Sequence, residues 1–223
     1  MSPGVLSLAA FFGFLTMQQP KVIVAAWGDS TTAGTPMFKS PVEAPPGGDG
    51  DATAPFAHWL MQAEPSWDVR NLGVNGERTD QIRARWERDV APLKASAVVI
   101  LAGVNDVYQG RAIDHVTTEL RAMYDLAAAA RIPVIAGSIV PYNTATPEQN
   151  AKMRAINDWI RGEAARDPNI TFADTRAAAA RDDNPDMLRS SPDGLHPDID
   201  GYRRMAQTLA PAIKAALASI IPP

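Results

Sequence analysis

A serine near one end of this 223-residue sequence, and an aspartate and a histidine close together near the other, lie in short glycine-containing segments and could act together. Ser30 follows Gly28 at the end of an apolar run, a pattern that exposes a hydroxyl in a tight turn between a strand and a helix. His196 lies in a Gly- and Pro-containing segment, three positions after Asp193. Because a histidine can take a serine proton and an aspartate can orient the imidazole, we predict that Ser30, His196 and Asp193 form a catalytic triad.

Three further groups could stabilise the oxyanion that forms when a serine attacks a carbonyl. The candidate donors are the backbone N–H groups of Ser30 and Gly76 and the side-chain amide of Asn105. Gly73 is the alternative to Gly76 because the same segment contains both glycines. Each group taken alone also fits an ordinary turn or helix cap, so the prediction depends on their joint occurrence.

Three neighbouring residues are candidates for contact with a substrate. Trp27 precedes the nucleophile turn and Tyr108 follows Asn105, so both rings could line a pocket, with core packing as the alternative for Trp27. Asp29 adjoins Ser30, and we expect it to shape the turn rather than to transfer protons. For His58 and His115, which both fall in predicted helices, we expect structural roles.

The elements that must position these residues follow from the apolar pattern. Short apolar runs alternate with segments of helical period, and they cover residues 22–26, 67–72, 97–102, 132–136 and 169–172. This alternation indicates repeated βα units and a parallel sheet with helices on both faces. Helices are predicted over residues 113–130, after an N-cap at Thr146, and near the C-terminal end, where Pro211 would bend or interrupt the helix. In such sheets ligands bind at the carboxyl ends of the strands, where the candidate residues lie.

Four segments in this order resemble the blocks of the SGNH hydrolases, the superfamily of GDSL-type serine esterases and lipases. They are Gly28-Asp29-Ser30, residues 71–76, Gly103-Val104-Asn105-Asp106 and Asp193-Gly194-Leu195-His196-Pro197, and the resemblance runs from about residue 22 to residue 201. It implies that Ser30 is the nucleophile, that Asp193 and His196 complete the triad, and that Gly76 and Asn105 complete the oxyanion hole. It also implies a flavodoxin-like, three-layer α/β/α fold with a five-stranded parallel sheet, and no cofactor. Thr31 stands where the family usually has leucine, which weakens a specific lipase assignment.

Composition excludes several other classes of protein. With 21 Lys and Arg against 25 Asp and Glu, the net charge of −4 argues against nucleic acid as a partner. The sequence contains no cysteine, which excludes disulfides, thiolate metal sites and a cysteine nucleophile. The acidic residues around Gly50 lack the rest of a calcium loop, so no metal is expected. The sequence leaves the oligomeric state open.

The chain divides into an apolar segment at residues 1–20 and one predicted hydrolase domain at residues 21–223. The first segment has the length of a signal-peptide core but lacks a preceding positive charge, so a secreted or periplasmic location and a cytoplasmic one both stay open. It is too short for stable insertion into a membrane. Residues 36–55 are rich in proline and glycine and are predicted to form a long loop without a regular element, either a lid or pocket wall or a floppy insertion.

We therefore predict a serine esterase that hydrolyses short-chain acyl or acetyl esters through an acyl-enzyme. Two substrate classes stay open: small-molecule esters, including thioesters and lysophospholipids, and acetylated carbohydrates. A non-catalytic carbohydrate-binding module would keep the fold without the activity. A nucleotide-binding protein is disfavoured because no glycine-rich phosphate loop follows the first apolar run, and a metal-dependent phosphatase would need clustered carboxylates.

Overall fold

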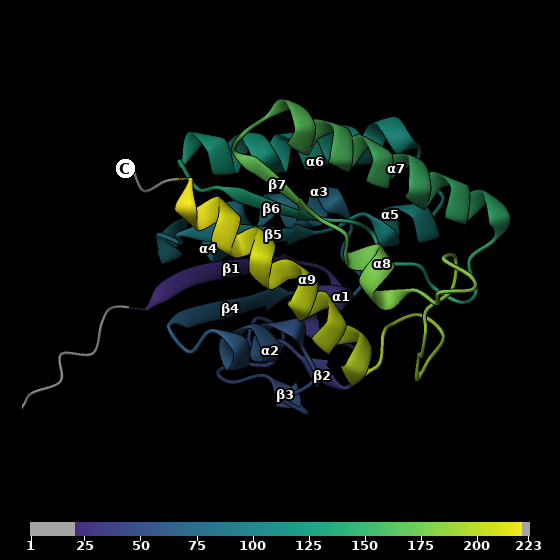
Figure 1. Cartoon of the computed structure of the whole chain (residues 1–223), viewed down its shortest axis with the longest axis horizontal. Coiled ribbons are helices and arrows are strands. Elements are labelled where there is room, and N and C mark those ends of the chain that lie inside the picture. Colours follow the sequence, from purple (N-terminus) through teal and green to yellow (C-terminus); the bar gives the residue numbers. More distant parts are fainter. Residues whose placement is uncertain (1–20, 220–223) are drawn as a thin grey trace, which may run out of the picture.

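A five-stranded parallel sheet forms the centre of the computed structural model, which describes residues 21–219 (Figure 1). Its strands follow the order β4-β1-β5-β6-β7 and are all parallel. Their bounds are β1 Val22–Gly28, β4 Trp67–Gly73, β5 Ala97–Leu101, β6 Val134–Gly137 and β7 Ile170–Ala173. The predicted number, type and approximate position of the strands are confirmed.

Both faces of the sheet are buried, and the central strand shows how the core divides between them. All five residues of β5 are buried. Val98 and Ile100 belong to one apolar cluster, whereas Val99 and Leu101 belong to the other. This alternation follows from the two-residue period of a strand, which sends successive side chains to opposite faces. Two separate cores therefore hold the sheet between its helical layers.

Helices cover both faces, which confirms the predicted three-layer α/β/α fold (Figure 1). One face packs against α2 (Phe56–Ala63), α8 (Thr175–Ala179) and α9 (Ile199–Ala218). The other face packs against α3 (Thr79–Ala84), α4 (Trp86–Asp89), α5 (Val104–Tyr108), α6 (Ile113–Ala129) and α7 (Pro147–Arg166). Two short elements complete the helical set: α1 (Ser30–Ala33) follows β1, and the 3₁₀ turn η1 (Ala91–Leu93) precedes β5.

The helix ends agree with the capping signals, with one correction. Thr146 caps α7 by accepting a hydrogen bond from the backbone N–H of Gln149, as predicted. Pro211 is predicted to bend or interrupt the last helix, and the interruption is wrong, because α9 continues through this residue. Pro211 removes one backbone donor, but the buried Leu209 and Ile213 on either side anchor the helix to the sheet. Among residues 21–219, no helix is both long enough and apolar enough to cross a membrane.

The proline- and glycine-rich segment 36–55 is more ordered than predicted. It contains β2 (Phe38–Lys39) and β3 (Asp49–Gly50), which pair in antiparallel fashion. The prediction of a loop without any regular element is therefore wrong for these four residues, because glycines with positive φ let the chain turn back on itself. Ser40 joins the segment to the sheet by donating a 2.5 Å hydrogen bond to the carbonyl of Gly73. The apolar segment 1–20 lies outside the described residues.

Candidate active site

Ser30 stands at the first position of α1, directly after the strand β1 and its cap residue. Asp29 caps this short helix by accepting a 2.9 Å hydrogen bond from the backbone N–H of Thr31. Gly28 permits the close approach of β5, because a Cβ at this position would lie 2.2 Å from the carbonyl oxygen of Leu101. The sequence thus folds into a tight strand-to-helix turn that presents the serine at the carboxyl edge of the sheet.

The structure brings Ser30, His196 and Asp193 into one hydrogen-bonded chain. The Nε2 atom of His196 lies 2.8 Å from the Oγ atom of Ser30, and its Nδ1 atom lies 2.7 Å from Oδ2 of Asp193. The other carboxylate oxygen of Asp193 accepts the backbone N–H groups of Leu195 (2.9 Å) and His196 (2.8 Å). This arrangement fixes the carboxylate against the imidazole and points the second ring nitrogen at the hydroxyl.

Asp193 stays charged in this setting. Partial burial raises its pKa, but the hydrogen bonds from the His196 side chain and from the two backbone N–H groups lower it by more. The net result is a pKa below the ordinary value of an aspartate. A carboxylate that remains ionised can stabilise an imidazolium at Nδ1.

Two of the predicted oxyanion donors border the same cavity as Ser30. Gly76 has φ of +74°, a left-handed conformation that favours glycine, and it lines the cavity. Asn105 also lines the cavity, and its side-chain amide donates a 2.9 Å hydrogen bond to the carbonyl of Glu77. Gly73, the alternative to Gly76, is packed against α1, where a Cβ would lie 2.2 Å from the backbone nitrogen of Ala33. Of the two glycines, Gly76 is therefore the one that faces the cavity.

The cavity has a volume of about 350 Å³ and combines polar groups with an aromatic and aliphatic rim. Tyr108 is 57% exposed and Leu195 is 36% exposed, and they are the large apolar side chains exposed among residues 21–219. The ring of Tyr108 meets that of Tyr142 edge to face, with 5.8 Å between their centroids. The lining residues beyond the triad and the oxyanion candidates are Thr31, Thr35, Asn75, Val104, Tyr108, Tyr142 and Leu195.

Two of the predicted substrate contacts need correction. Trp27 is fully buried and packs edge to face against Trp86, with 5.3 Å between the ring centroids. It points into the core because the alternation of β1 turns it toward the layer of α4. Asp29 is also buried and does not line the cavity, since its side chain is turned inward to cap α1. Tyr108, the third candidate, does border the cavity.

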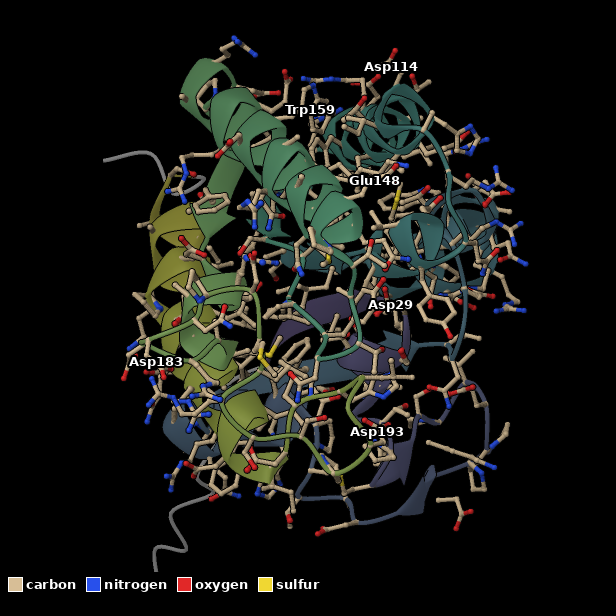
Figure 2. All side chains as sticks on the ribbon, turned by 90° about the vertical axis from the view of Figure 1, so that its right-hand side faces the viewer. Asp29, Asp114, Glu148, Trp159, Asp183 and Asp193 are labelled. Carbon is tan, nitrogen blue, oxygen red and sulfur yellow. The ribbon has the colours of Figure 1, made fainter. Side chains whose placement is uncertain are left out.

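Burial changes the acidity of Asp29. Desolvation raises its pKa to about 7, although hydrogen bonds from Thr31 oppose the change. In Figure 2, Asp29 and Asp193 are labelled near the centre of the view, with Asp193 below Asp29. Asp29 is therefore a structural acid beneath the nucleophile turn, whereas Asp193 is the carboxylate that contacts the imidazole.

Among residues 21–219, one group of side chains has the spacing and chemistry of metal ligands, but each member already has a protein partner. Asp80, Asp106 and His115 bring their ligand atoms within 4.8 Å of one another. Asp80 pairs with Arg78, the carboxylate of Asp106 accepts both donors of Thr79, and His115 contacts Arg111. This group lies outside the residues that line the cavity. His58 lies on α2 against Trp59, in agreement with the structural role expected for it.

The structure adds residues that sequence reasoning missed. Thr35 and Asn75 line the cavity and are joined by a side-chain hydrogen bond. Tyr142 lies after the carboxyl end of β6, a position that the strand-end argument could have singled out. Arg85 lies beneath the site, where it bonds to backbone carbonyls that carry no signal in a single sequence.

Comparison with known proteins places this geometry in context. Residues 26–204 match the GDSL-like lipase/acylhydrolase family. An acetylxylan esterase of Geobacillus stearothermophilus is 27% identical over 166 residues, which cover 66% of this chain and 74% of that protein.

Solved structures share the fold. A member of the lipolytic G-D-S-L family from Veillonella parvula has a TM-score of 0.70 at 20% identity, covering 86% of this chain and 98% of that one. A GDSL-like lipase from Bacteroides thetaiotaomicron has a TM-score of 0.67 at 22% identity, covering 90% and 89%. At this level of identity the structural likeness concerns the fold alone.

Proposed function

Because this chain belongs to the GDSL-like lipase/acylhydrolase family, we propose that Ser30, His196 and Asp193 are the residues with which it hydrolyses carboxylic esters. The observation that carries this assignment is the continuous hydrogen-bonded chain from Asp193 through His196 to Ser30. The enzyme is a carboxylic ester hydrolase; the proposal concerns which groups act and on what kind of ester.

In the first half of the proposed reaction, Ser30 attacks the ester carbonyl. His196 accepts the hydroxyl proton at Nε2, which is already 2.8 Å from Oγ, and Asp193 stabilises the imidazolium at Nδ1. The negative charge that develops on the carbonyl oxygen is held by the N–H groups of Ser30 and Gly76 and by the amide of Asn105. The C–O bond then breaks, and the alcohol leaves with the proton from His196.

In the second half, water replaces the alcohol. His196 takes a proton from this water as it attacks the acyl-enzyme, and the same three donors hold the second oxyanion. Collapse of this intermediate breaks the bond to Ser30, which regains its proton from His196. The products are the carboxylic acid and the free serine.

The size of the cavity supports a small acyl group. A volume of about 350 Å³ is at the lower end of the roughly 300–1,000 Å³ found for small-molecule sites, and the acyl and alcohol groups must share it. The polar wall formed by Thr35 and Asn75 also reduces the apolar surface that a long acyl chain would need. We therefore expect the highest turnover on acetyl and other short-chain esters.

The test is the initial rate of hydrolysis of p-nitrophenyl esters from acetate to long acyl chains, with and without a chelator. We expect chelator-insensitive turnover with an optimum at short chains, and loss of turnover in Ser30→Ala. An optimum at long chains would contradict the small acyl group. Unchanged turnover in Ser30→Ala would overturn the proposed nucleophile.

An acetylated carbohydrate is the second candidate substrate, and the exposed ring of Tyr108 favours it. A tyrosine that is 57% exposed at the rim of a partly polar cavity provides an apolar face and a polar tip for a sugar ring. The acetylxylan esterase that is 27% identical to this chain supports the same substrate class. We expect a higher kcat/KM on acetylated xylo-oligosaccharides than on p-nitrophenyl acetate. Equal values of kcat/KM on the two substrates would argue that the sugar makes no favourable contact.

A further inference from the structure

Arg85 is a buried arginine at the junction of α3 and α4, below the candidate oxyanion donors. Its side chain is 8% exposed. Nε donates a 2.6 Å hydrogen bond to the carboxylate of Glu77, and Nη1 contacts the carboxylate of Asp89. The same guanidinium donates to two backbone carbonyls, those of Leu72 (3.2 Å) and Gly28 (3.1 Å). Each of the three guanidinium nitrogen atoms therefore donates at least one hydrogen bond, and the planar group binds four acceptors at once.

The two carbonyls mark the ends of the two strands that lead into the site. Gly28 closes β1 two residues before Ser30, and Leu72 lies near the end of β4, four residues before Gly76. The two strands are neighbours in the sheet. By binding both carbonyls, Arg85 links the backbone that presents Ser30 to the backbone that presents Gly76.

Glu77 extends the same link to the third donor. Its carboxylate accepts the hydrogen bond from Arg85, while its backbone carbonyl accepts a 2.9 Å hydrogen bond from the side-chain amide of Asn105. Glu77 also follows Gly76 directly in sequence. Arg85 is thus bonded directly to the two strands that lead to Ser30 and Gly76, and it is connected to Asn105 through Glu77.

We infer that Arg85 is a positioning residue that fixes the three oxyanion donors relative to one another. The inference rests on the proposed function, since it assigns Arg85 a role in the transition state of that reaction. Donors of this kind are effective because they are held in place before charge develops, and loss of one typically costs about 10²–10³ in turnover. Lysine keeps the charge of Arg85 but offers one nitrogen, so it cannot serve both carbonyls and Glu77 together.

The competing explanation is that Arg85 only stabilises the fold as a buried ion pair. Arg176 provides a matched control for this explanation, because it is also a buried arginine and pairs with Asp186 at 2.8 Å. Arg176 belongs to α8, which packs on the other face of the sheet from α3 and α4. A purely structural role predicts the same behaviour for both arginines.

The experiment compares Arg85→Lys with Arg176→Lys, using kcat and KM on p-nitrophenyl acetate and the midpoint of thermal unfolding. Both variants are expected to unfold at a lower temperature. We expect Arg85→Lys to lower kcat by about 10- to 100-fold with KM changed by less than about threefold, since the donors act in the transition state. Arg176→Lys should keep kcat within about twofold of the wild type. Equal kcat in folded Arg85→Lys and wild type would overturn the inference.

A double-mutant cycle measures the coupling in kcat between Arg85 and Asn105, which a purely structural role of Arg85 would not produce. If Arg85 acts in part through Asn105, Arg85→Lys should lower kcat by a smaller factor when Asn105→Ala is already present than it does in the wild type, since only the two backbone donors then remain to be positioned. Fully independent losses in the double variant would overturn the positioning of Asn105 by Arg85. If Arg85→Lys does not fold, the same cycle is run with Glu77→Gln, which keeps the size of the side chain; we expect about a tenfold loss in kcat alone and a smaller loss with Asn105→Ala.

Failure of this inference can be told apart from failure of the proposed function. Loss of turnover in Ser30→Ala tests the nucleophile and does not depend on Arg85. If Ser30→Ala is inactive and Arg85→Lys has wild-type kcat, the esterase mechanism stands and the positioning role falls. If Ser30→Ala retains full turnover, both fall.

Discussion

The Nε2 atom of His196 lies 2.8 Å from the Oγ atom of Ser30, although 166 positions separate the two residues in the sequence. The contact joins the end of the first strand to the loop before the last helix. The imidazole therefore lies within hydrogen-bonding distance of the serine hydroxyl. We propose that the two residues act as a unit, so that loss of either one removes the same function.

Ser30→Ala and His196→Ala should each lower kcat on p-nitrophenyl acetate by about 10⁴- to 10⁶-fold. The double variant should be little worse than either single variant, because the two groups act in one step. Circular dichroism and thermal unfolding of the variants provide the control for folding. A single variant with more than a tenth of wild-type turnover would exclude that residue from the reaction.

Asn105→Ala should lower kcat by about 10²- to 10³-fold with a small change in KM. The amide is expected to meet negative charge in the transition state more strongly than the neutral carbonyl of the ground state. Steady-state kinetics on a short-chain ester measure both constants. A rise in KM with kcat unchanged would indicate a role in substrate binding instead.

Asp193→Asn should lower kcat by about 10²- to 10⁴-fold, since a neutral amide stabilises an imidazolium poorly. The pKa of Asp193 is below its ordinary value, so the contribution of its charge to stability is present above the unfolded-state pKa near 4 and is lost as the pH falls through the lower folded-state value. Unfolding by urea, measured between pH 3 and 7, should therefore separate wild type from Asp193→Asn more at pH 7 than at pH 3. The same separation at both pH values would contradict this assignment.

Asp29 should make the protein less stable as the pH rises, whereas Asp193 should make it more stable. Its pKa is raised to about 7 by burial, so the folded state keeps its proton while the unfolded chain loses it near pH 4. The stability that this proton provides is complete below about pH 4 and is lost progressively up to about pH 7, by a few kcal/mol. Asp29→Asn removes the titration, and urea unfolding from pH 4 to 8 should show wild type falling relative to the variant. Parallel curves would mean that Asp29 is ionised in the folded protein.

Tyr108→Ala should separate the two substrate classes. If the exposed ring contacts a sugar, kcat/KM on acetylated xylo-oligosaccharides should fall about 2- to 13-fold, as expected from an aromatic contact worth about 0.5–1.5 kcal/mol. The value on p-nitrophenyl acetate should change by less than about twofold. Tyr108→Phe keeps the ring and serves as the matched control. An equal fall on both substrates would place Tyr108 beside the acyl group.

The site residues that could be predicted from the sequence are those that have a suitable residue type and also follow shortly after a strand. Ser30, Asn105 and Gly76 each follow a strand, and the carboxyl ends of parallel strands meet at one edge of the sheet. The structure brings these residues to one cavity together with His196. The fold was predictable for a similar reason, since five apolar runs separated by helical segments admit few arrangements.

Other features had no signal in one sequence. The direction of Trp27 was not readable because both faces of β1 are buried, so the apolar pattern does not alternate and cannot say which side a ring occupies. Arg85 escaped notice because its key partners are backbone carbonyls, which every residue possesses. The β2 and β3 pair was missed because two-residue strands are shorter than any periodic pattern.

Ser30 and His196 lie near opposite ends of the described chain, and this separation affects when activity can appear during synthesis. A ribosome makes β1 early and the loop with His196 late, with all the other strands of the sheet in between. Under the proposed mechanism, a growing chain has the turn that carries Ser30 before it has the histidine that accepts the serine proton, so we expect no ester turnover until residue 196 has left the exit tunnel and docked. We therefore expect catalytic activity to appear only after all five strands of the sheet have been made, and a truncation before residue 196 to abolish it even where the earlier strands have already folded.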